Sequence, residues 1–153
     1  MANTYTQITI QLVFAVQNRK ALIRKPFQET LHKYIGGIFR NQKQKLLVIN
    51  SVPDHIHILF GMSPTCRLSD LVRDVKSESS RFINEERLSN FHFNWQEGYG
   101  AFSYSKSQRD TVIKYILNQE EHHRKKNFRE EYFKMLDEFE IEYKDEYCFE
   151  FFD

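Results

Sequence analysis

Residues 5–16 alternate apolar and polar side chains with a period of two, and this rhythm is typical of a β-strand rather than a helix. The apolar members are Ile8, Ile10, Leu12, Phe14 and Val16, and the polar members between them are Gln7, Thr9 and Gln11. Because successive side chains of a strand point to opposite faces, the pattern predicts a half-buried strand with one face against a core.

Five further elements are predicted along the chain. Two β-rich runs are joined by a tight Pro53-Asp54 turn, and two amphipathic stretches have helical spacing. A last strand is predicted from Phe91, Phe93 and Trp95 to about Tyr104, with a break near Gly98 and the three large aromatic residues in the core. In chain order, the elements after the first strand are a helix at 27–41, strands at 46–52 and 55–60, a helix at 68–87 and the strand at 91–104.

The order β-α-β-β-α-β predicts an α+β fold, namely a ferredoxin-like (RRM-like) antiparallel sheet with packed helices. Ser107, with Asp110 three residues later, has the spacing of a capping box, which predicts a further helix from there to about Lys126. Val112, Ile113, Ile116 and Leu117 form the expected buried stripe of this C-terminal, tyrosine-bearing helix. A short helix and an extended acidic segment are expected after residue 127.

Length and composition limit the class of protein. The 153 residues contain no repeat or linker, so residues 1–153 are expected to form a single domain. No apolar run approaches the roughly 20 residues of a membrane span, and the N-terminus lacks the pattern of a signal peptide. Cys66 and Cys148 have no metal-type or disulfide spacing. A cytoplasmic protein with reduced thiols is therefore expected.

The net charge of +1 conceals an uneven distribution. Residues 1–50 carry eight Lys or Arg against one acid, whereas residues 127–153 carry a net charge of −7. A basic body favours phosphate binding, although such charge runs are more often simply solvated.

Two histidines stand in the strand at residues 55–60. His55 and His57 are two apart, so both imidazoles are expected on one face while Ile56 and Ile58 enter the core. Two neighbouring imidazoles supply half of a divalent-metal site. Taken alone, such a pair more often belongs to an ordinary polar strand face.

The predicted C-terminal helix brings further polar groups together. Tyr115 and Gln119 are four apart and are expected to share one face, with His122 on the next turn. Taken alone, a helical tyrosine is usually an amphipathic packing residue.

Three segments taken together indicate a function far more specifically than the histidine pair or the tyrosine alone. The strand PDHIHILF, the stretch WQEGYGAFS and the helix TVIKYILNQEEHH, in this order, resemble the HUH-type single-tyrosine transposases of insertion sequences that move as single-stranded DNA. REP-associated tyrosine transposases are relatives within this group. The resemblance implies that His55, His57 and Gln119 ligate a Mg²⁺ or Mn²⁺ ion and that Tyr115 is the nucleophile.

The resemblance also implies the reaction and the partners. Tyr115 would attack a phosphodiester, become joined to the 5′ phosphate and release a 3′ hydroxyl, and a second strand's 3′ hydroxyl would reseal the bond. The expected substrate is single-stranded DNA with a foldback hairpin, and the expected assembly is a homodimer in which the tyrosine helix of one protomer serves the histidine pair of the other. The polar segment 103–107 could act as the hinge.

Basic side chains are the candidates for gripping DNA phosphates. They are Arg19, Lys20, Arg24, Lys25, Lys76, Arg81, Arg124, Lys125 and Lys126.

Two alternatives remain open at this point. One is a replication initiator, relaxase or host-retained relative with the same chemistry. The other is a non-catalytic nucleic-acid-binding module of ferredoxin-like fold, in which Tyr115 and Gln119 are ordinary helix residues.

Overall fold

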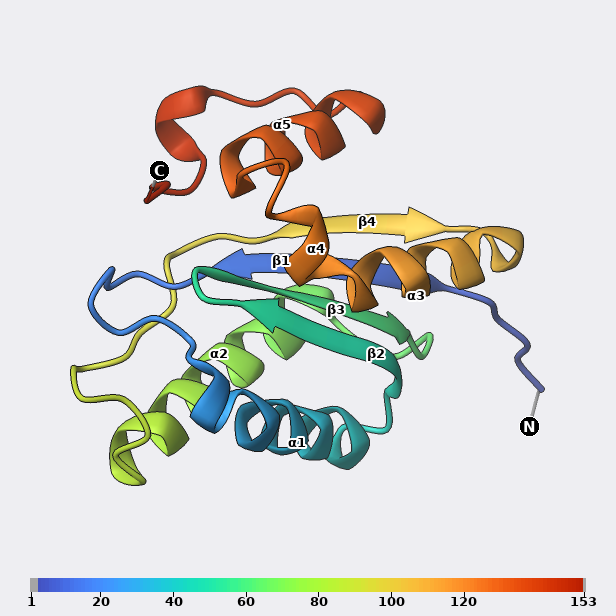
Figure 1. The fold of residues 1–153 in the computed structure, drawn as a ribbon. Helices are drawn as coiled ribbons and strands as arrows, with labels where there is room; N and C mark the ends of the chain where they lie inside the picture. The colour runs from blue at the N-terminus through green and yellow to red at the C-terminus, as the bar shows by residue number, and fades with distance from the viewer. Residues whose placement is uncertain (1–2, 153) are drawn as a thin grey trace.

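The computed structural model describes residues 3–152 and contains a four-stranded antiparallel sheet (Figure 1). The strands lie in the order β2-β3-β1-β4. Their bounds are β1 Thr9–Ala15, β2 Lys45–Val52, β3 His55–Gly61 and β4 Gly100–Tyr104. The predicted ferredoxin-like α+β fold is confirmed, and β3 and β1 are its two central strands.

Helices cover both faces of the sheet. α1 (Lys25–Asn41) and α2 (Leu68–Glu85) lie on one face, and the C-terminal helices lie on the other (Figure 1). The C-terminal set comprises the short 3-10 turn η1 (Lys106–Gln108), α3 (Arg109–Leu117), α4 (Gln119–His122), α5 (Phe128–Glu138) and η2 (Asp145–Tyr147). None of the helices in residues 3–152 is long and apolar enough to cross a membrane.

The main core lies between the sheet and the α1–α2 layer. Alternate residues of β3 enter it, so Ile56, Ile58 and Phe60 are fully buried there. Trp95 packs edge-on against both Phe14 and Phe93, and its indole N–H donates to Ser79 Oγ at 2.9 Å. This apolar layer makes β3 rigid and leaves its opposite face free for polar side chains.

The prediction of a half-buried first strand is wrong. All seven residues of β1 are buried, including the polar Thr9 and Gln11, because the second helical layer covers the face that the alternation assigned to solvent. The strand also begins only at Thr9.

The predicted strand at 91–104 is largely irregular. Only Gly100–Tyr104 pairs with β1, while Trp95 makes an isolated bridge with Val16. The backbone of Phe93 bonds instead to the side chain of Asn84. Phe93 and Trp95 are in the core as predicted, but Phe91 is half exposed.

The single helix predicted from Ser107 to Lys126 is broken. α3 ends at Leu117 and α4 begins at Gln119, because the Asn50 side-chain amide of β2 donates to the carbonyls of Ile116 and Leu117. The N-terminal capping box uses Ser105 and Gln108 rather than the predicted pair. Val112 and Ile116 are buried as expected, whereas Ile113 is only half-buried and Leu117 is exposed.

Gly100 allows α5 to approach the sheet closely. A Cβ atom built at this position would lie 2.8 Å from the ring of Tyr132, which is the neighbour of Glu131 on α5. Only a residue without a side chain fits between β4 and this ring.

We therefore expect Gly100→Ala to lower the free energy of unfolding by about 1–3 kcal/mol, because overpacking forces Tyr132 and α5 away from the sheet. Urea denaturation measures the change. Gly61→Ala is the matched control, because its new Cβ would meet only Lys45 at an ordinary 3.6 Å. Equal stability of Gly100→Ala and the wild type would show that α5 does not depend on this contact.

Candidate active site and metal centre

β3 presents two buried histidines on the face opposite the main core. His55 and His57 pair with Ala15 and Val13 of β1 in the antiparallel register, and neither histidine is exposed to solvent. Their shared face follows from the period of two that buries Ile56 and Ile58 on the other side.

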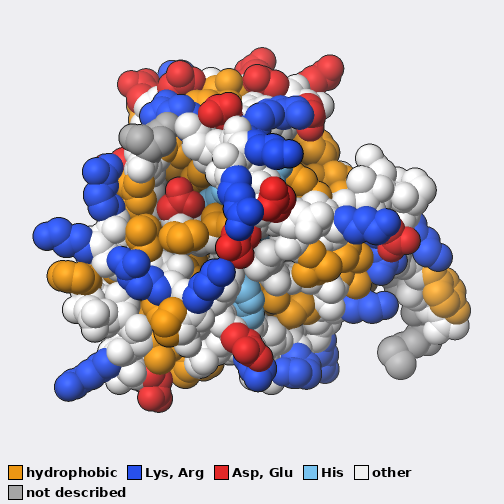
Figure 2. Space-filling model, in the orientation of Figure 1, with side chains coloured by type: hydrophobic (Ala, Val, Ile, Leu, Met, Phe, Trp, Pro, Cys, Tyr) orange, Lys and Arg blue, Asp and Glu red, His pale blue; other side chains and the backbone are white. Residues whose placement is uncertain are grey.

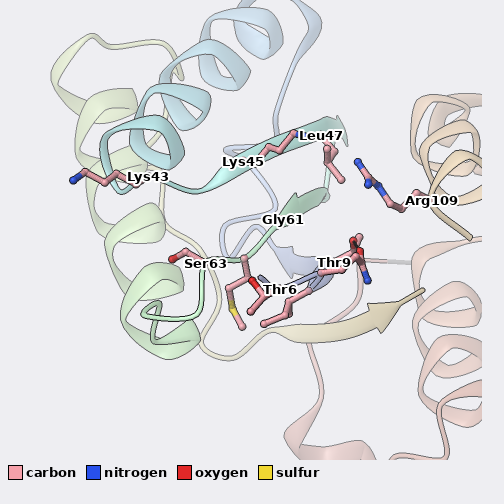
Figure 3. A pocket seen from close by; sticks show the side chains of 11 residues that line it. Thr6, Thr9, Lys43, Lys45, Leu47, Gly61, Ser63 and Arg109 are labelled. Carbon is pink, nitrogen blue, oxygen red and sulfur yellow. Dashed lines mark hydrogen bonds between the residues drawn. The ribbon is translucent and has the colours of Figure 1, made fainter. Parts of the chain in front are cut away.

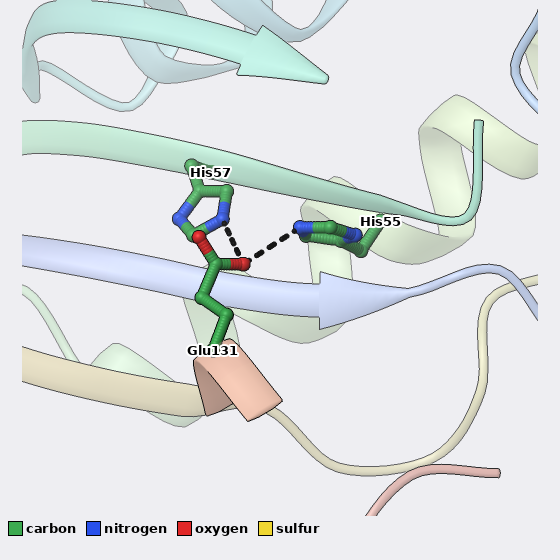
Figure 4. A group of neighbouring side chains, drawn as sticks. All are labelled: His55, His57 and Glu131. Atoms are coloured by element: carbon green, nitrogen blue, oxygen red, sulfur yellow. Dashed lines mark hydrogen bonds and ion pairs between the residues drawn. The ribbon is translucent and has the colours of Figure 1, made fainter. Parts of the chain in front are cut away.

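The Glu131 carboxylate of α5 lies between the two imidazoles (Figure 4). Its Oε1 atom is 3.0 Å from His55 Nε2 and 3.2 Å from His57 Nε2. Glu131 is itself buried, although it is separated from the histidines by more than 70 residues of chain. The fold therefore brings two imidazoles and a carboxylate to one point.

The α3–α4 segment adds the tyrosine and the glutamine. The Tyr115 hydroxyl donates to Glu131 Oε2, and the Gln119 amide donates to the same oxygen at 3.1 Å. The other atom of this amide, Gln119 Oε1, lies 3.0 Å from His123 Nε2. His55, His57, Tyr115 and Gln119 thus converge on one carboxylate, and all of them belong to the same chain. The set is complete without a partner protomer, so the fold does not require the expected trans arrangement.

Sequence reasoning missed two members of this cluster. His123 Nε2 lies 3.2 Å from Glu131 Oε1, and the ring of His123 packs edge-on against His55. His122 was expected one turn beyond Gln119, and its Nε2 atom lies 3.5 Å from the Tyr115 hydroxyl. The break at Asn118 turns α4, so both histidines reach the site. No local pattern distinguishes Glu131 from the exposed Glu130 beside it, except that Glu131 falls on the buried face of α5 with Phe128 and Tyr132.

His55 lies between two carboxylates. Its Nδ1 atom is 2.8 Å from Asp54 Oδ1, and its Nε2 atom faces Glu131. Burial alone would lower the pKa of His55, but the hydrogen bonds to these two acids outweigh it and raise the pKa. Each ring nitrogen faces an acceptor, so either a proton or a cation has to stand between Nε2 and Glu131.

The electrostatics hold the tyrosine as a neutral phenol in this arrangement. Burial and the adjacent Glu131 charge both raise the pKa of Tyr115. The pKa of Glu131 is lowered, because the surrounding histidines outweigh the effect of its burial. Burial lowers the pKa of His57, although Glu131 opposes this shift.

The cluster fits a divalent cation. His55, His57 and Glu131 each offer one ligand atom, and these atoms all lie within 4.8 Å of one another. The 3.0 and 3.2 Å separations from Glu131 Oε1 match neighbouring ligands around an octahedral ion, which lie about 3 Å apart when the bonds are near 2.1 Å. Imidazole and carboxylate ligands suit Mn²⁺, and Mg²⁺ is compatible with the carboxylate. These three residues could therefore hold a metal ion.

Only some of the candidate DNA-binding residues lie together. Arg24, Lys25 and Arg124 come from distant segments yet line one cavity of about 470 Å³, which His123 connects to the metal cluster. Figure 2 shows Lys and Arg side chains across the middle of the view, interspersed with a few acidic ones, and a gathering of acidic side chains over the C-terminal part at the top.

The other candidates lie apart from this cavity or are engaged inside the protein. Lys76 Nζ donates to the backbone carbonyl of Gln96 at 2.8 Å, and burial lowers its pKa to about 8, so it is poorly placed to grip a phosphate. The guanidinium of Arg19 lies over the Phe152 ring, and Lys20 lies over Phe91. Arg81 is on α2, in the opposite layer. Lys125 and Lys126 directly follow Arg124 in the chain.

A separate cavity of about 300 Å³ lies at the far end of the sheet from His55 (Figure 3). Gly61 at the end of β3 lines it together with Lys45 and Arg109. None of the clustered residues around Glu131 contributes to it.

An antiparallel ferredoxin-like sheet with a His-x-His pair on the central strand β3, and a tyrosine beside it from the helix that follows the last strand, defines the class of HUH-type single-tyrosine transposases. The sequence profile of the family "Transposase IS200 like" matches residues 4–119. This match covers most of the chain, and the chain therefore belongs to the IS200-like transposase family. Glu131 and His123 lie beyond the matched residues.

Individual relatives agree with this assignment. The ISDra2 transposase TnpA of Deinococcus radiodurans is 23% identical over 118 residues, which is 74% of this chain and 84% of the relative. A crystal structure from Deinococcus radiodurans, assigned as a transposase, matches with a TM-score of 0.60 and 21% identity, over 78% of this chain and 96% of the other. A REP-associated tyrosine transposase bound to a REP hairpin matches with a TM-score of 0.61 and 14% identity, over 80% and 73%. At these identities the two solved structures support the fold.

We expect Glu131→Gln to weaken Mn²⁺ binding about tenfold or more, because a neutral amide replaces the only carboxylate of the cluster. Isothermal titration calorimetry without DNA measures the affinity. Glu130→Gln on the exposed face of the same helix turn is the control and should bind the ion as the wild type does. Unchanged affinity in Glu131→Gln would exclude this carboxylate from the metal site.

Proposed function

We propose that this transposase cleaves and rejoins single-stranded DNA at the ends of an insertion sequence, with Tyr115 as the nucleophile. The observation that carries the proposal is the convergence of Tyr115, His55 and His57 on one buried point, at Glu131, within a single chain. A binding module would gain nothing from burying these polar groups together, since each must be desolvated.

The reaction is a phosphoryl transfer to a protein side chain. The Tyr115 phenol gives up its proton to Glu131 Oε2, the acceptor of its hydrogen bond. Its oxygen attacks the scissile phosphorus in line, the bond from phosphorus to the 3′ oxygen breaks, and the released oxygen takes up a proton to become a 3′ hydroxyl. The 5′ phosphate stays joined to Tyr115. A 3′ hydroxyl of another strand then attacks this phosphotyrosine and restores the phenol, so the strand is rejoined without another energy source.

His55, His57 and Glu131 would hold a Mg²⁺ or Mn²⁺ ion, with the Gln119 amide as a further ligand. When bound, the ion would polarise the scissile phosphate and offset the negative charge that now opposes ionisation of Tyr115. Gln119 and His123 keep the Glu131 carboxylate in place through contacts of 3.1 and 3.2 Å, and Gln119 Oε1 lies 3.0 Å from His123 Nε2. The Tyr115 phenol is oriented by the same carboxylate.

The proposed substrate is single-stranded DNA with a foldback hairpin, and the REP-associated relative was solved bound to a REP hairpin. Unpaired nucleotides would reach the site along the cavity of Arg24, Lys25 and Arg124. The apolar lining residues Ile23, Val52 and Pro53 suit bases, and the basic ones suit phosphates. Glu120 also lines this cavity and forms an ion pair with Lys25 at 3.1 Å, which an incoming phosphate would have to replace.

A replication initiator or host-retained nuclease would use the same site on another DNA. The match to the IS200-like family favours the transposase. A homodimer is also proposed from the resemblance, and static light scattering measures it.

Tyr115→Phe should reduce cleavage of single-stranded element ends by about a thousandfold or more, because no covalent intermediate can form without the phenolic oxygen. The ring keeps its packing, so DNA affinity in a gel-shift assay should stay within about twofold. Denaturing gels of labelled DNA detect the covalent adduct in the wild type when metal is added. Tyr34→Phe is the matched tyrosine control, because Tyr34 lies on α1 in the opposite layer, where its ring stacks on Phe82.

A mixing experiment tests whether each chain forms its own site. Tyr115→Phe and His57→Ala proteins, mixed under conditions that exchange subunits, should remain inactive because neither chain carries the complete set. Recovery of cleavage would establish the trans arrangement instead, and a persistent adduct with Tyr115→Phe alone would reassign the nucleophile.

The double variant Arg24→Ala/Arg124→Ala should bind single-stranded DNA more weakly and with less salt dependence. Removal of two phosphate contacts lowers the slope of log affinity against log salt by about 1.4. Lys33→Ala/Arg40→Ala on the exposed side of α1 is the charge-matched control. A slope equal to that of the wild type would show that the strand does not follow this cavity. Fluorescence anisotropy across a salt series provides the measurement.

A further inference from the structure

A buried glutamine on the central strand β1 contacts the far side of the His57 ring. The Gln11 amide nitrogen donates to His57 Nδ1 at 2.8 Å, and the Tyr104 hydroxyl donates to Gln11 Oε1 at 2.7 Å. Gln11 is 1% exposed, and His57 has no exposed surface. Both ends of the amide are therefore used, and its partners lie on the two strands that flank β1.

This hydrogen-bond direction fixes the position of the His57 proton. Because Nδ1 accepts from Gln11, the proton of the neutral ring lies on Nε2, where it points at Glu131 Oε1 at 3.2 Å. A ring in this tautomer has no lone pair at Nε2 for a metal ion. His55 is different, because the Asp54 carboxylate at its Nδ1 can only accept.

We propose that Gln11 is a positioning residue whose side-chain amide turns over when the metal site is filled, so that His57 changes tautomer. The proposal rests on the metal site of the proposed function but concerns residues outside that site's ligand set. In the turned arrangement Oε1 accepts from His57 Nδ1–H, and the Gln11 amide nitrogen donates to the Tyr104 oxygen. Nε2 is then free to ligate.

Tyr104 allows the Gln11 amide to turn over without the loss of a hydrogen bond. A phenol can donate or accept, and burial raises the pKa of Tyr104 to about 12, so it keeps its proton in both arrangements. The same number of hydrogen bonds is made before and after the turn. The imidazole also carries one proton in each state, on Nε2 in the first and on Nδ1 in the second.

The glutamine has no evident packing role that a leucine could not fill. A polar side chain at a fully covered strand position is costly unless its hydrogen bonds serve a purpose, and metal-bound histidines nearly always donate their second N–H to such a partner. Loss of that partner typically weakens metal binding by about 10- to 100-fold.

The first test measures Mn²⁺ affinity without DNA in three variants. Gln11→Leu should bind the ion about 10- to 100-fold more weakly than the wild type. Gln11→Glu, which can only accept from Nδ1–H, should bind it at least as tightly as the wild type. Gln44→Leu is the matched control, since Gln44 is another buried glutamine whose partners are Gln42 and Ser63, remote from the histidines.

The second test reads the tautomer directly from the ¹⁵N shifts of the His57 ring. The metal-free wild type should show the proton on Nε2, and addition of Mg²⁺ should move it to Nδ1. In Gln11→Glu the proton should be on Nδ1 under both conditions. If Gln11 only fills space, the Gln11→Glu substitution should leave the position of the His57 proton as it is in the wild type.

Two results would overturn the proposal: wild-type metal affinity in a folded Gln11→Leu protein, or a His57 tautomer that is the same with and without Mg²⁺. Should Gln11→Leu fail to fold, Gln11→Glu and the ring shifts still decide. Neither test involves DNA, so a wild type that binds metal and switches tautomer but never cleaves would contradict the proposed function alone.

Discussion

The buried carboxylate of Glu131 connects the sheet to the C-terminal helices that cover one of its faces. One of its oxygens faces three imidazoles, and the other accepts from Tyr115 and Gln119. A buried carboxylate without such partners would be strongly destabilising, so the surrounding groups and α5 hold one another in place. Because these partners come from β3, α3, α4 and the turn after α4, this charge ties the C-terminal layer to the sheet at one point. Apolar contacts, such as those of Tyr132 and Ile116, hold the same layer elsewhere.

The two faces of the sheet have different tasks. The face toward α1 and α2 is apolar and supplies the main core, with Ile56, Ile58 and Phe60 locked among aromatic side chains. The other face carries polar residues from neighbouring strands, among them His57, Gln11 and Tyr104, within hydrogen-bonding distance of one another. Rigid packing on the first face gives the second the fixed geometry that a reactive site needs.

Charge is arranged around this site on a larger scale. The acidic C-terminal segment covers one side, whereas Arg24, Lys25 and Arg124 border the cavity beside His123. On the proposed function, phosphates are repelled from the first side and attracted to the second, so a strand is guided toward Tyr115 from the basic side. The match to the IS200-like family ends at Gln119, so Glu131 and the acidic segment come from the part of the chain beyond the match.

The sequence by itself determined the order of elements, the ferredoxin-like sheet and the shared face of His55 and His57, because periods of two and of 3.6 are local properties of the chain. The same local patterns wrongly predicted that one face of β1 is exposed to water and that one helix continues through Asn118. Both predictions failed because the layer that covers β1 and the contact from Asn50 join residues far apart in sequence. Glu131, His123 and Gln11 entered the site only through tertiary structure. Their side chains look like ordinary helix or strand residues until packing excludes water from them, and only then does each hydrogen bond constrain the next.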